Sequence, residues 1–389
     1  MSLKSMIATI CHLSLLAPLF FSYAASAQER AGPPAADQAP IALLVDMNSG
    51  QTLFSRDADR RFVPASITKV MTASLAFDLL ENGALRLDQA MTVRPDTFRD
   101  WSGVGSTMFL PHDARVTVDQ LLHGITTVSA NDASVVLGEG AAGSLDHWTR
   151  LMNENAAKIG MFDSRFGTPN GWPDDARTYT TAGDLVRLAE DLIRRHPAKY
   201  AHFFGQPRYR FNNITQNNHD PFVGKVPGGD GLKTGFTNQA GYGFLGSVER
   251  DGRRLIVVVA GADSAYSRNK AAVQLVEWGF SAFQPRTLFD ANSVVAAAKV
   301  QGGAKPSVGL RTDQAVIWSG RPGSETSPNV SIEYHGPISA PLEADTPVAQ
   351  MALTMPDGSV SRVPLYAAET IDAGTWFDRL LSGFARWLA

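Results

Sequence analysis

The spacing of the apolar residues changes near residue 283. Up to that point, long stretches carry apolar residues at helical spacing, whereas residues 290–366 show short apolar alternations separated by Gly, Pro and Asp. A period near 3.6 predicts helices that pack on a core, and a period of 2 with turn residues predicts antiparallel strands. The change therefore predicts two folded parts, a mixed α/β domain in residues 28–283 and a small β-rich domain in residues 284–367.

Helices and strands are both predicted in the first domain, which we expect to be an α/β (α+β) domain with an antiparallel sheet flanked by helices. Apolar periodicity and helix start and stop signals predict helices over residues 64–82, 119–127, 132–142, 145–159, 181–194 and 269–280. Strands are predicted over residues 41–46, 51–55, 240–249 and 253–260. Turn residues at positions 48–50 and 250–252 predict that each pair of strands forms a hairpin.

Residues 1–27 are typical of a secretory signal peptide. Lys4 gives a positive start, residues 6–21 are mostly apolar, and the A-S-A tripeptide at 25–27 forms a small-x-small cleavage site. An N-terminal membrane anchor is the alternative, but the apolar stretch is short for a membrane span. The single cysteine, Cys11, lies in this segment, so the mature chain would have no disulfide. Export without disulfides favours a bacterial envelope over eukaryotic secretion.

The tail, residues 368–389, is predicted to form a short amphipathic helix. Its apolar residues recur at helical spacing, with charged and polar residues on the other side. They are Trp376, Phe377, Leu380, Leu381, Phe384, Trp387 and Leu388. An aromatic-rich face of this kind suits the headgroup boundary, so we expect the helix to attach the protein to a membrane surface. A helix that docks on its own domain is the alternative.

Charge and residue content argue against several classes of function. The chain has 35 Lys and Arg against 38 Asp and Glu, a net charge of −3, which gives no sign of nucleic-acid binding. The sequence contains no H-E-x-x-H pattern and one cysteine, so it does not support a zinc peptidase. We expect neither a metal nor an organic cofactor.

Three short motifs occur in order along the chain: Ser66-Ile67-Thr68-Lys69 (S-x-x-K), Ser129-Ala130-Asn131 (S-x-N) and Lys233-Thr234-Gly235 (K-T-G). Each motif alone is a weak signal, because residues 267–270 also match S-x-x-K and residues 327–329 also match S-x-N. These duplicates cannot complete the ordered set, since K-T-G occurs once and precedes both of them. The ordered trio therefore carries the functional prediction.

The first two motifs fit covalent catalysis by a serine. A serine hydroxyl needs a base within hydrogen-bond reach, and Lys69 lies one helical turn from Ser66 on the same face. An amine can serve as that base only if burial or nearby positive charge lowers its pKa, and Lys233 could supply such charge. Ser129 could relay a proton to a leaving amine, and Asn131 could orient Lys69 and the substrate amide.

The third motif suits a substrate-binding strand. Backbone groups at a strand edge can pair with an extended peptide, Gly235 lets the chain come close to the acyl centre, and Lys233 and Thr234 can bind a carboxylate. For each residue taken alone, an ordinary structural role is the alternative: a helix cap for Ser66, solvated charges for the lysines, and turn residues at 129–131.

The sequence resembles the low-molecular-mass penicillin-binding proteins, the D-alanyl-D-alanine carboxypeptidases related to penicillin-binding protein 5 (peptidase family S11), over nearly the whole mature chain. Beyond the motifs, supporting stretches are MNENAAKIGM, GTPNGWPDDARTYTTAGDL and APLEADTPVAQM. The resemblance implies that Ser66 is the acylated nucleophile, Lys69 its base, and Ser129 with Asn131 the second motif. It implies that residues 233–235 bind substrate, that the backbone N–H groups of Ser66 and Phe236 form the oxyanion hole, and that Arg268 helps to hold the terminal carboxylate. A surface charge at a helix start is the alternative for Arg268.

Some positions depart from the family pattern or from its β-lactamase relatives. His219 stands where some relatives carry Arg, and no role is transferred to it. Ala130 replaces the Asp of S-D-N, and residues 160–175 contain no Glu to position a deacylating water. We therefore expect a slowly hydrolysed penicillin acyl-enzyme and no rapid β-lactam hydrolysis.

These observations together predict a serine-type D-Ala-D-Ala carboxypeptidase. It would remove the terminal D-alanine from peptidoglycan pentapeptides through an acyl-enzyme on Ser66, and β-lactam antibiotics would inhibit it covalently. We expect it in the bacterial periplasm, held on the outer face of the inner membrane by the tail helix. A D,D-endopeptidase or weak β-lactamase that uses the same site, or a non-catalytic wall-binding module that determines cell shape, are the alternatives.

Overall fold

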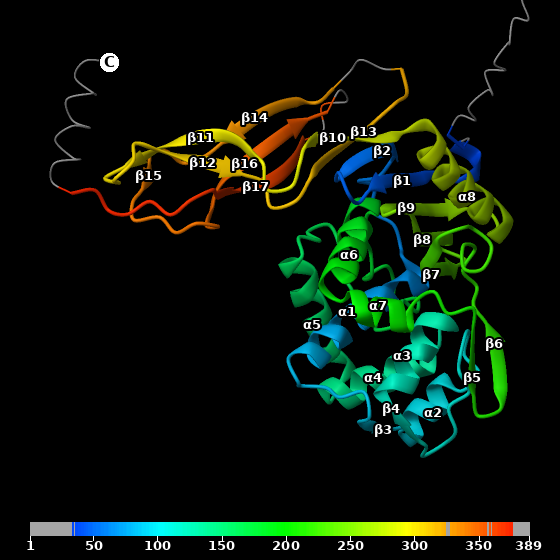
Figure 1. Ribbon diagram of the computed structural model, residues 1–389. Coiled ribbons are helices and arrows are strands. Elements are labelled where there is room, and N and C mark those ends of the chain that lie inside the picture. The colour runs from blue at the N-terminus through cyan, green and yellow to red at the C-terminus, as the bar shows by residue number, and fades with distance from the viewer. Residues whose placement is uncertain (1–32, 35, 324–326, 356–357, 359, 376–389) are drawn as a thin grey trace, which may run out of the picture. The chain divides into compact units, whose positions relative to one another are not determined.

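The computed structural model describes residues 33–375, with the exception of 35, 324–326, 356, 357 and 359 (Figure 1). The predicted signal peptide, residues 1–27, lies outside the described residues. So do residues 376–389, which carry the whole aromatic face of the predicted tail helix.

A five-stranded antiparallel sheet lies at the centre of the region before residue 284, in the order β2-β1-β9-β8-β7. Its strands are β1 (Ile41–Asp46), β2 (Gln51–Arg56), β7 (Gly229–Thr237), β8 (Gly241–Arg250) and β9 (Arg253–Ala262). Both predicted hairpins are confirmed. Because β1 also pairs with β9, the two ends of this region meet in one sheet, and β7 is left at the edge.

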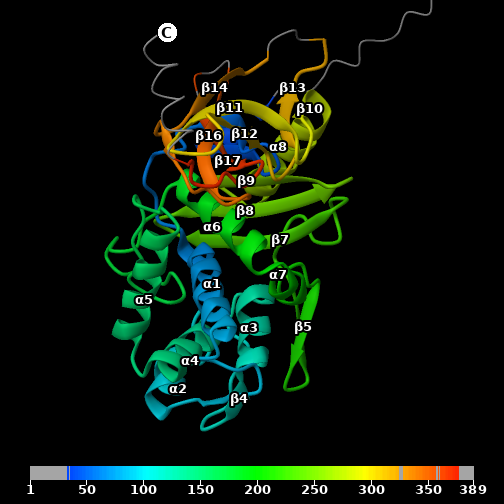
Figure 2. The ribbon, with the colours of Figure 1, turned by 60° about the vertical axis from the view of Figure 1, so that its left-hand side comes forward.

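Both faces of this sheet are covered, which explains why every residue of β1 is buried. Ile41, Leu43 and Val45 contribute to the core under the larger group of helices, while Ala42 and Leu44 pack with helix α8 (Ala265–Ala282) on the other face. The side chains of a strand alternate between faces, so a strand buried on both faces has a continuous apolar sequence. Figure 2 shows α8 and the larger helical group on opposite sides of the sheet.

The larger helical group contains most of the predicted helices. Its members are the 3-10 turn η2 (Ala65–Ile67), α1 (Thr68–Glu81), α2 (Pro95–Trp101), α3 (Val118–Thr127), α4 (Asn131–Ala142), α5 (Leu145–Lys158), α6 (Ala182–Arg195) and α7 (Pro197–Phe203). The prediction of one continuous helix from residue 64 is corrected, because residues 65–67 form a 3-10 turn. Helix α3 begins with a capping box in which Thr117 and Gln120 exchange hydrogen bonds, and this fixes its start.

Sequence reasoning missed several short elements of this region. They are α2, α7, the hairpin of β3 (Ala90–Thr92) with β4 (Arg115–Thr117), and the hairpin of β5 (Arg208–Phe211) with β6 (Ile214–Asn217). The last helix is also longer than predicted, since α8 begins at Ala265, where Ser264 caps it through the backbone N–H of Ser267.

The region from residue 284 is composed of strands, as predicted. A two-stranded sheet pairs β10 (Gln284–Phe289) with β13 (Val316–Gly320), and a six-stranded sheet has the order β14-β16-β17-β12-β11-β15. The strands of the larger sheet are β11 (Val294–Gln301), β12 (Ser307–Arg311), β14 (Asn329–Glu333), β15 (Ile338–Ser339), β16 (Pro347–Thr354) and β17 (Val360–Ala367). Their apolar side chains form a separate core.

The start of the predicted tail helix is corrected. Ile371 and Ala373 form isolated bridges with Leu342 and Gly303, respectively, and Ile371 is buried in the core of the β region. Burial of Ile371 and these backbone pairs favour an extended chain in residues 369–375. Among the residues that the structure describes, no helix is both long and apolar enough to cross a membrane.

Candidate active site

Ser66 and Lys69 lie together where the chain leaves the sheet and enters α1. Ser66 is in the 3-10 turn η2, and Lys69 is in the first turn of α1 with its side chain completely enclosed. The distance between Lys69 Nζ and Ser66 Oγ is 2.8 Å. The residue before the serine, Ala65, has φ of +48°, an uncommon conformation for a residue with a Cβ. Such strain is often concentrated at functional sites.

Lys69 has no carboxylate partner in the described structure. Its Nζ lies 2.8 Å from Asn131 Oδ1 and 2.9 Å from the backbone oxygen of Asn170, besides the contact to Ser66. Burial lowers the pKa of Lys69 well below its usual range, and the nearby charge of Lys233 lowers it further. These effects favour the neutral form of the amine beside the serine hydroxyl.

The S-x-N motif connects α3 to α4 and lies beside Ser66 and Lys69. Ser129 has φ of +63°, and Asn131 is the first residue of α4. The side chain of Asn131 donates to the Val104 carbonyl at 3.0 Å, and its backbone N–H donates to the Ser106 carbonyl at 2.8 Å. Asn131 thus links Lys69 to the loop that brings Ser106 to the site.

Asp132 fixes the continuation of that loop. Its two carboxylate oxygens accept the backbone N–H groups of Met108 and Leu110, both at 3.1 Å. Burial raises the pKa of Asp132 despite these hydrogen bonds. The residue that follows Asn131 is therefore used to hold the backbone that surrounds the site.

The K-T-G motif lies on the edge strand β7, which packs against the turn that carries Ser66. A Cβ added at Gly235 would lie 2.5 Å from the Pro64 carbonyl oxygen, so only glycine allows this approach. Lys233 is buried and donates to the carbonyl of Thr234 at 3.0 Å. Burial lowers the pKa of Lys233 to about 7, although the charge of Asp220 acts in the opposite direction.

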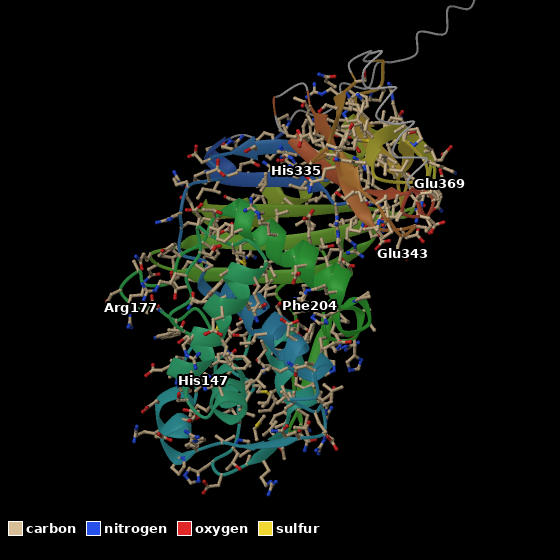
Figure 3. The ribbon with its side chains drawn as sticks, turned by 90° about the vertical axis from the view of Figure 1, so that its left-hand side faces the viewer. His147, Arg177, Phe204, His335, Glu343 and Glu369 are labelled. Atoms are coloured by element: carbon tan, nitrogen blue, oxygen red, sulfur yellow. The ribbon has the colours of Figure 1, made fainter. Side chains whose placement is uncertain are left out.

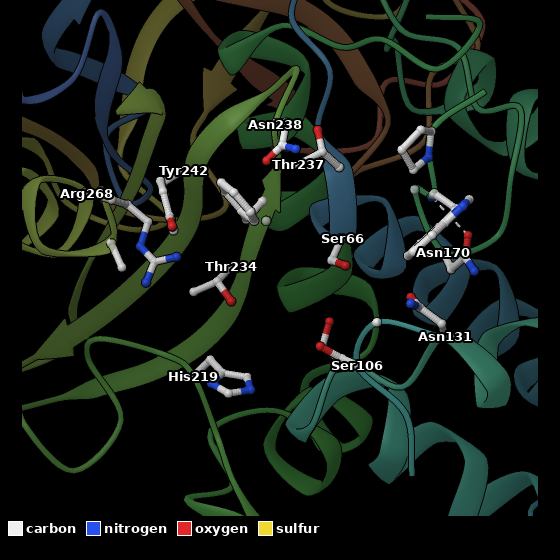
Figure 4. Close-up of a pocket in the computed structure, with 18 residues that line it drawn as sticks. Ser66, Ser106, Asn131, Asn170, His219, Thr234, Thr237, Asn238, Tyr242 and Arg268 are labelled. Atoms are coloured by element: carbon white, nitrogen blue, oxygen red, sulfur yellow. Dashed lines mark hydrogen bonds between the residues drawn. The ribbon is translucent and has the colours of Figure 1, made fainter. Parts of the chain in front are cut away.

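A pocket of about 560 Å³ lies between these elements (Figure 4). All of the predicted site residues line it except the two lysines, which lie buried behind its wall. The predicted residues in the lining are Ser66, Ser129, Asn131, Thr234, Gly235, Phe236 and Arg268. The structure thus brings together residues that are far apart in sequence.

One side of the pocket is positively charged. Arg268 is buried in the first turn of α8, donates through Nε to Asn269 Oδ1 at 2.9 Å and lies over the ring of Tyr242 at 6.0 Å. His219 also lines this side, and burial followed by the charge of Lys233 lowers its pKa. With Thr234, these groups can receive an anionic group.

Several lining residues were missed by sequence reasoning. Ser106, Asn170 and Trp172 come from irregular loops, and Tyr242 lies in β8, where a strand pattern does not indicate which residues line a pocket. Asn170 precedes Gly171, whose φ is +74° and where a Cβ would lie 1.8 Å from the Ala65 carbonyl oxygen. The Asn-Gly dipeptide is a turn signal that could have marked this loop, although it gives no indication that the Asn170 carbonyl meets Lys69.

Comparison with known proteins gives consistent matches over both regions. Residues 27–264 match the family described as D-alanyl-D-alanine carboxypeptidase (peptidase S11), and residues 283–373 match the C-terminal domain of penicillin-binding protein 5. The chain is 32% identical over 349 residues to the D-alanyl-D-alanine carboxypeptidase DacD of Escherichia coli, with 88% of this chain and 89% of the relative covered.

Solved structures agree with these sequence matches. Penicillin-binding protein 5 from Haemophilus influenzae superposes with a TM-score of 0.76 at 28% identity, with 88% of this chain and 99% of that chain covered. Penicillin-binding protein D2 from Listeria monocytogenes, in its ampicillin-bound form, gives a TM-score of 0.57 at 31% identity and covers 64% of this chain and 100% of its own.

Proposed function

The chain belongs to the D-alanyl-D-alanine carboxypeptidase family, peptidase S11, as a serine D-Ala-D-Ala carboxypeptidase, and from this premise we propose that Ser66 is its nucleophile. The observation that carries the proposal is the 2.8 Å contact between Ser66 Oγ, which lines the pocket, and the amine of Lys69, which is buried behind the pocket wall. The substrate is the D-Ala–D-Ala terminus of a peptidoglycan stem pentapeptide.

The three contacts of Lys69 support its role as the base. The Asn131 side-chain oxygen and the Asn170 backbone oxygen can only accept hydrogen bonds, so they take the two hydrogens of a neutral amine. The amine lone pair is then left for the third contact, the hydroxyl hydrogen of Ser66. This arrangement prepares Lys69 to remove the proton as Ser66 attacks.

From this arrangement we propose acylation of Ser66 followed by hydrolysis of the ester. Ser66 Oγ bonds to the carbonyl carbon of the penultimate D-Ala while its proton moves to Lys69, and the negative oxygen is bound by the backbone N–H groups of Ser66 and Phe236. The C–N bond breaks, and the proton that Lys69 took from Ser66 passes through Ser129 to the leaving amine, which departs as D-alanine. Water then hydrolyses the ester and frees Ser66. Asn131 keeps Lys69 in place throughout.

The positive side of the pocket suits the free carboxylate of the terminal D-Ala. We assign this group to Thr234 and Arg268 in the pocket lining, with Lys233 contributing its charge from behind the wall, while the chain of the substrate pairs with the edge of β7 near Gly235. A β-lactam carries a carboxylate close to its reactive amide. We therefore propose that penicillins acylate Ser66 as well.

We also propose the domain division and the location that the sequence suggests. The catalytic domain comprises residues 28–283 and the β-rich domain residues 284–367. Residues 1–27 direct export to the periplasm, and the aromatic face in residues 376–389 attaches the protein to the inner membrane. Removing residues 376–389 should abolish co-sedimentation with anionic lipid vesicles and leave turnover unchanged; vesicle binding that persists would refute the attachment.

Release of D-Ala from a synthetic pentapeptide, followed with mass detection of both products, tests the catalytic proposal. We expect the wild type to release D-Ala and the Ser66→Ala variant to release none. Ser267→Ala is the matched control, because Ser267 begins the duplicate S-x-x-K motif, and it should retain activity. Equal turnover by Ser66→Ala and wild type would exclude Ser66 as the nucleophile. A cross-linked dimeric peptide in the same assay measures endopeptidase activity.

A further inference from the structure

A cluster of one carboxylate and two imidazoles lies where α3 meets α7, apart from the residues that line the catalytic pocket. Asp119 and His123 are one helical turn apart on α3, and His202 is in the last turn of α7. Asp119 Oδ1 is 3.3 Å from His202 Nε2 and 3.9 Å from His123 Nε2. All three potential ligand atoms lie within 4.8 Å of one another.

These separations are close to those of a metal site. Ligands that bind zinc tetrahedrally at about 2.0–2.1 Å lie about 3.3 Å from one another. The 3.3 Å separation of Asp119 Oδ1 from His202 Nε2 already fits, and the longer separations, up to 4.8 Å, would shorten on binding. Two imidazoles with one carboxylate are a ligand set that suits zinc and related transition metals and does not suit Mg²⁺ or Ca²⁺, which prefer oxygen. The side chain of His202 is 55% exposed, which leaves room for water as a fourth ligand.

Both imidazoles are held in position by aromatic contacts. The buried Phe203 ring lies 4.8 Å from the ring of His123 and 4.6 Å from that of His202, and Tyr209 stacks on His123 at 5.5 Å. The two helices are also joined directly, since Thr126 Oγ1 donates to the Phe203 carbonyl at 2.8 Å. They lie side by side in Figures 1 and 2. The ligands therefore need little reorganisation to bind an ion.

The Asp119 carboxylate is available to a cation. Among the ion pairs of the described residues, its partners are the two histidines, and neither Lys nor Arg contacts it. We propose that Asp119, His123 and His202 form a binding site for a divalent transition metal of the zinc class, which links α3 to α7. Helix α3 leads directly into the loop that carries Ser129. The ion would therefore stabilise the position of α3, and with it that loop, and would take no part in the reaction.

Direct titration of the full chain, without an affinity tag and after treatment with a chelator, tests the site. We expect calorimetry with ZnCl₂ to give one ion per chain. His202→Ala should weaken the binding at least about tenfold, as should Asp119→Asn, which keeps the shape of the side chain and removes its charge. His112→Ala is the matched control, because His112 pairs with the single carboxylate of Asp113 and has no second imidazole, and it should bind zinc as the wild type does.

Two further readouts separate a metal site from a packing cluster. Co²⁺ should produce visible absorption bands in the wild type that are lost in His202→Ala, and saturating zinc should raise the melting temperature of the wild type and not that of this variant. The proposal would be overturned by absent zinc binding, by binding that His202→Ala leaves unchanged, or by equal affinity for Mg²⁺. Penicillin acylation measured on each variant checks that it is folded.

Discussion

The regions before and after residue 284 differ in what they bury. The first encloses ionisable side chains, among them Lys69, Asp132, Asp220, Lys233 and Arg268, whereas the second, in the residues that the structure describes, encloses Thr312 and Ser319 as its buried polar side chains. In Figure 3, the labelled His335, Glu343 and Glu369 of the second region lie at its surface. Both regions have apolar cores, so a core alone does not require buried charge.

The buried charges of the first region fall into two kinds. Arg253 is an example of the first, because it pairs with Asp46 at 2.8 Å and also donates to the Phe283 carbonyl and to Ser319 Oγ. Lys69 and Lys233 are of the second kind: their hydrogen bonds go to neutral oxygens, and burial lowers the pKa of each. Burying a lysine without a carboxylate costs stability, so we attribute these two lysines to function.

Substitution of Lys69 in the first region should cause the largest loss of activity. Lys69→Met keeps the length of the side chain and removes the base, so we expect the rate of acylation by a fluorescent penicillin to fall by about 10²- to 10⁴-fold. Lys270→Met, in the duplicate S-x-x-K motif, is the control and should acylate normally, because Lys270 is exposed. Acylation by Lys69→Met at the wild-type rate would show that this buried lysine is structural.

Arg268 should affect substrate binding more than the chemical step. Arg268→Ala removes a charged hydrogen-bond donor from the pocket, which is worth about 1.5–3 kcal/mol, so we expect KM for the pentapeptide to rise about 10- to 100-fold. Arg268→Lys should recover only part of this loss, because lysine lacks the planar fork. A fall in kcat with KM unchanged would contradict carboxylate binding by Arg268.

Asp220 offers a test of the pH dependence. Burial lowers the pKa of Lys233 to about 7, and the negative charge of Asp220 raises it. The charged form of Lys233 attracts the substrate carboxylate and is lost as the pH rises through its pKa. Because Asp220 raises that pKa, Asp220→Asn should lower it further. We expect the alkaline limb of the kcat/KM profile to move to lower pH. A limb that moves to higher pH or stays in place would refute the coupling.

The smallest effect on activity is expected from the core of the second region. Leu365 is completely buried there, and Leu365→Ala should lower the free energy of unfolding by about 2–5 kcal/mol. Because the site lies wholly in the first region, the acylation rate should not change. The matched variant Leu121→Ala, in the helix that leads to Ser129, should reduce both stability and acylation. Loss of acylation in Leu365→Ala would mean that the β region supports the site.

Sequence patterns predicted the long helices and strands, and they missed the short elements and the loops. Helices α3 and α4 were found because apolar residues recur at helical spacing over several turns. The β5–β6 hairpin was missed because each strand is four residues long and mostly exposed, so the alternation of Tyr209 and Phe211 with arginines in β5 is too short to stand out. The 3-10 turn η2, which precedes α1, was mistaken for α-helix. Local sequence does not encode the positive φ of Ala65, because that conformation depends on tertiary contacts.

The same distinction holds for the site. The three motifs were identifiable because their residue types and order are specific. The carbonyl of Asn170 was not, since its role depends on the position of a backbone oxygen, and any residue type supplies such an oxygen. Asp132 was likewise missed, because its function is to hold Met108 and Leu110, which only the folded chain brings near.

The most direct test of the account is to find the atom that a penicillin acylates. Intact-protein mass spectrometry after brief exposure to benzylpenicillin, followed by peptide mapping, should find one adduct per chain, located on Ser66. Ser66→Ala should carry none. An adduct on any other residue, or one that forms equally on Ser66→Ala, would contradict the claim that the buried lysines serve a nucleophilic serine at this position.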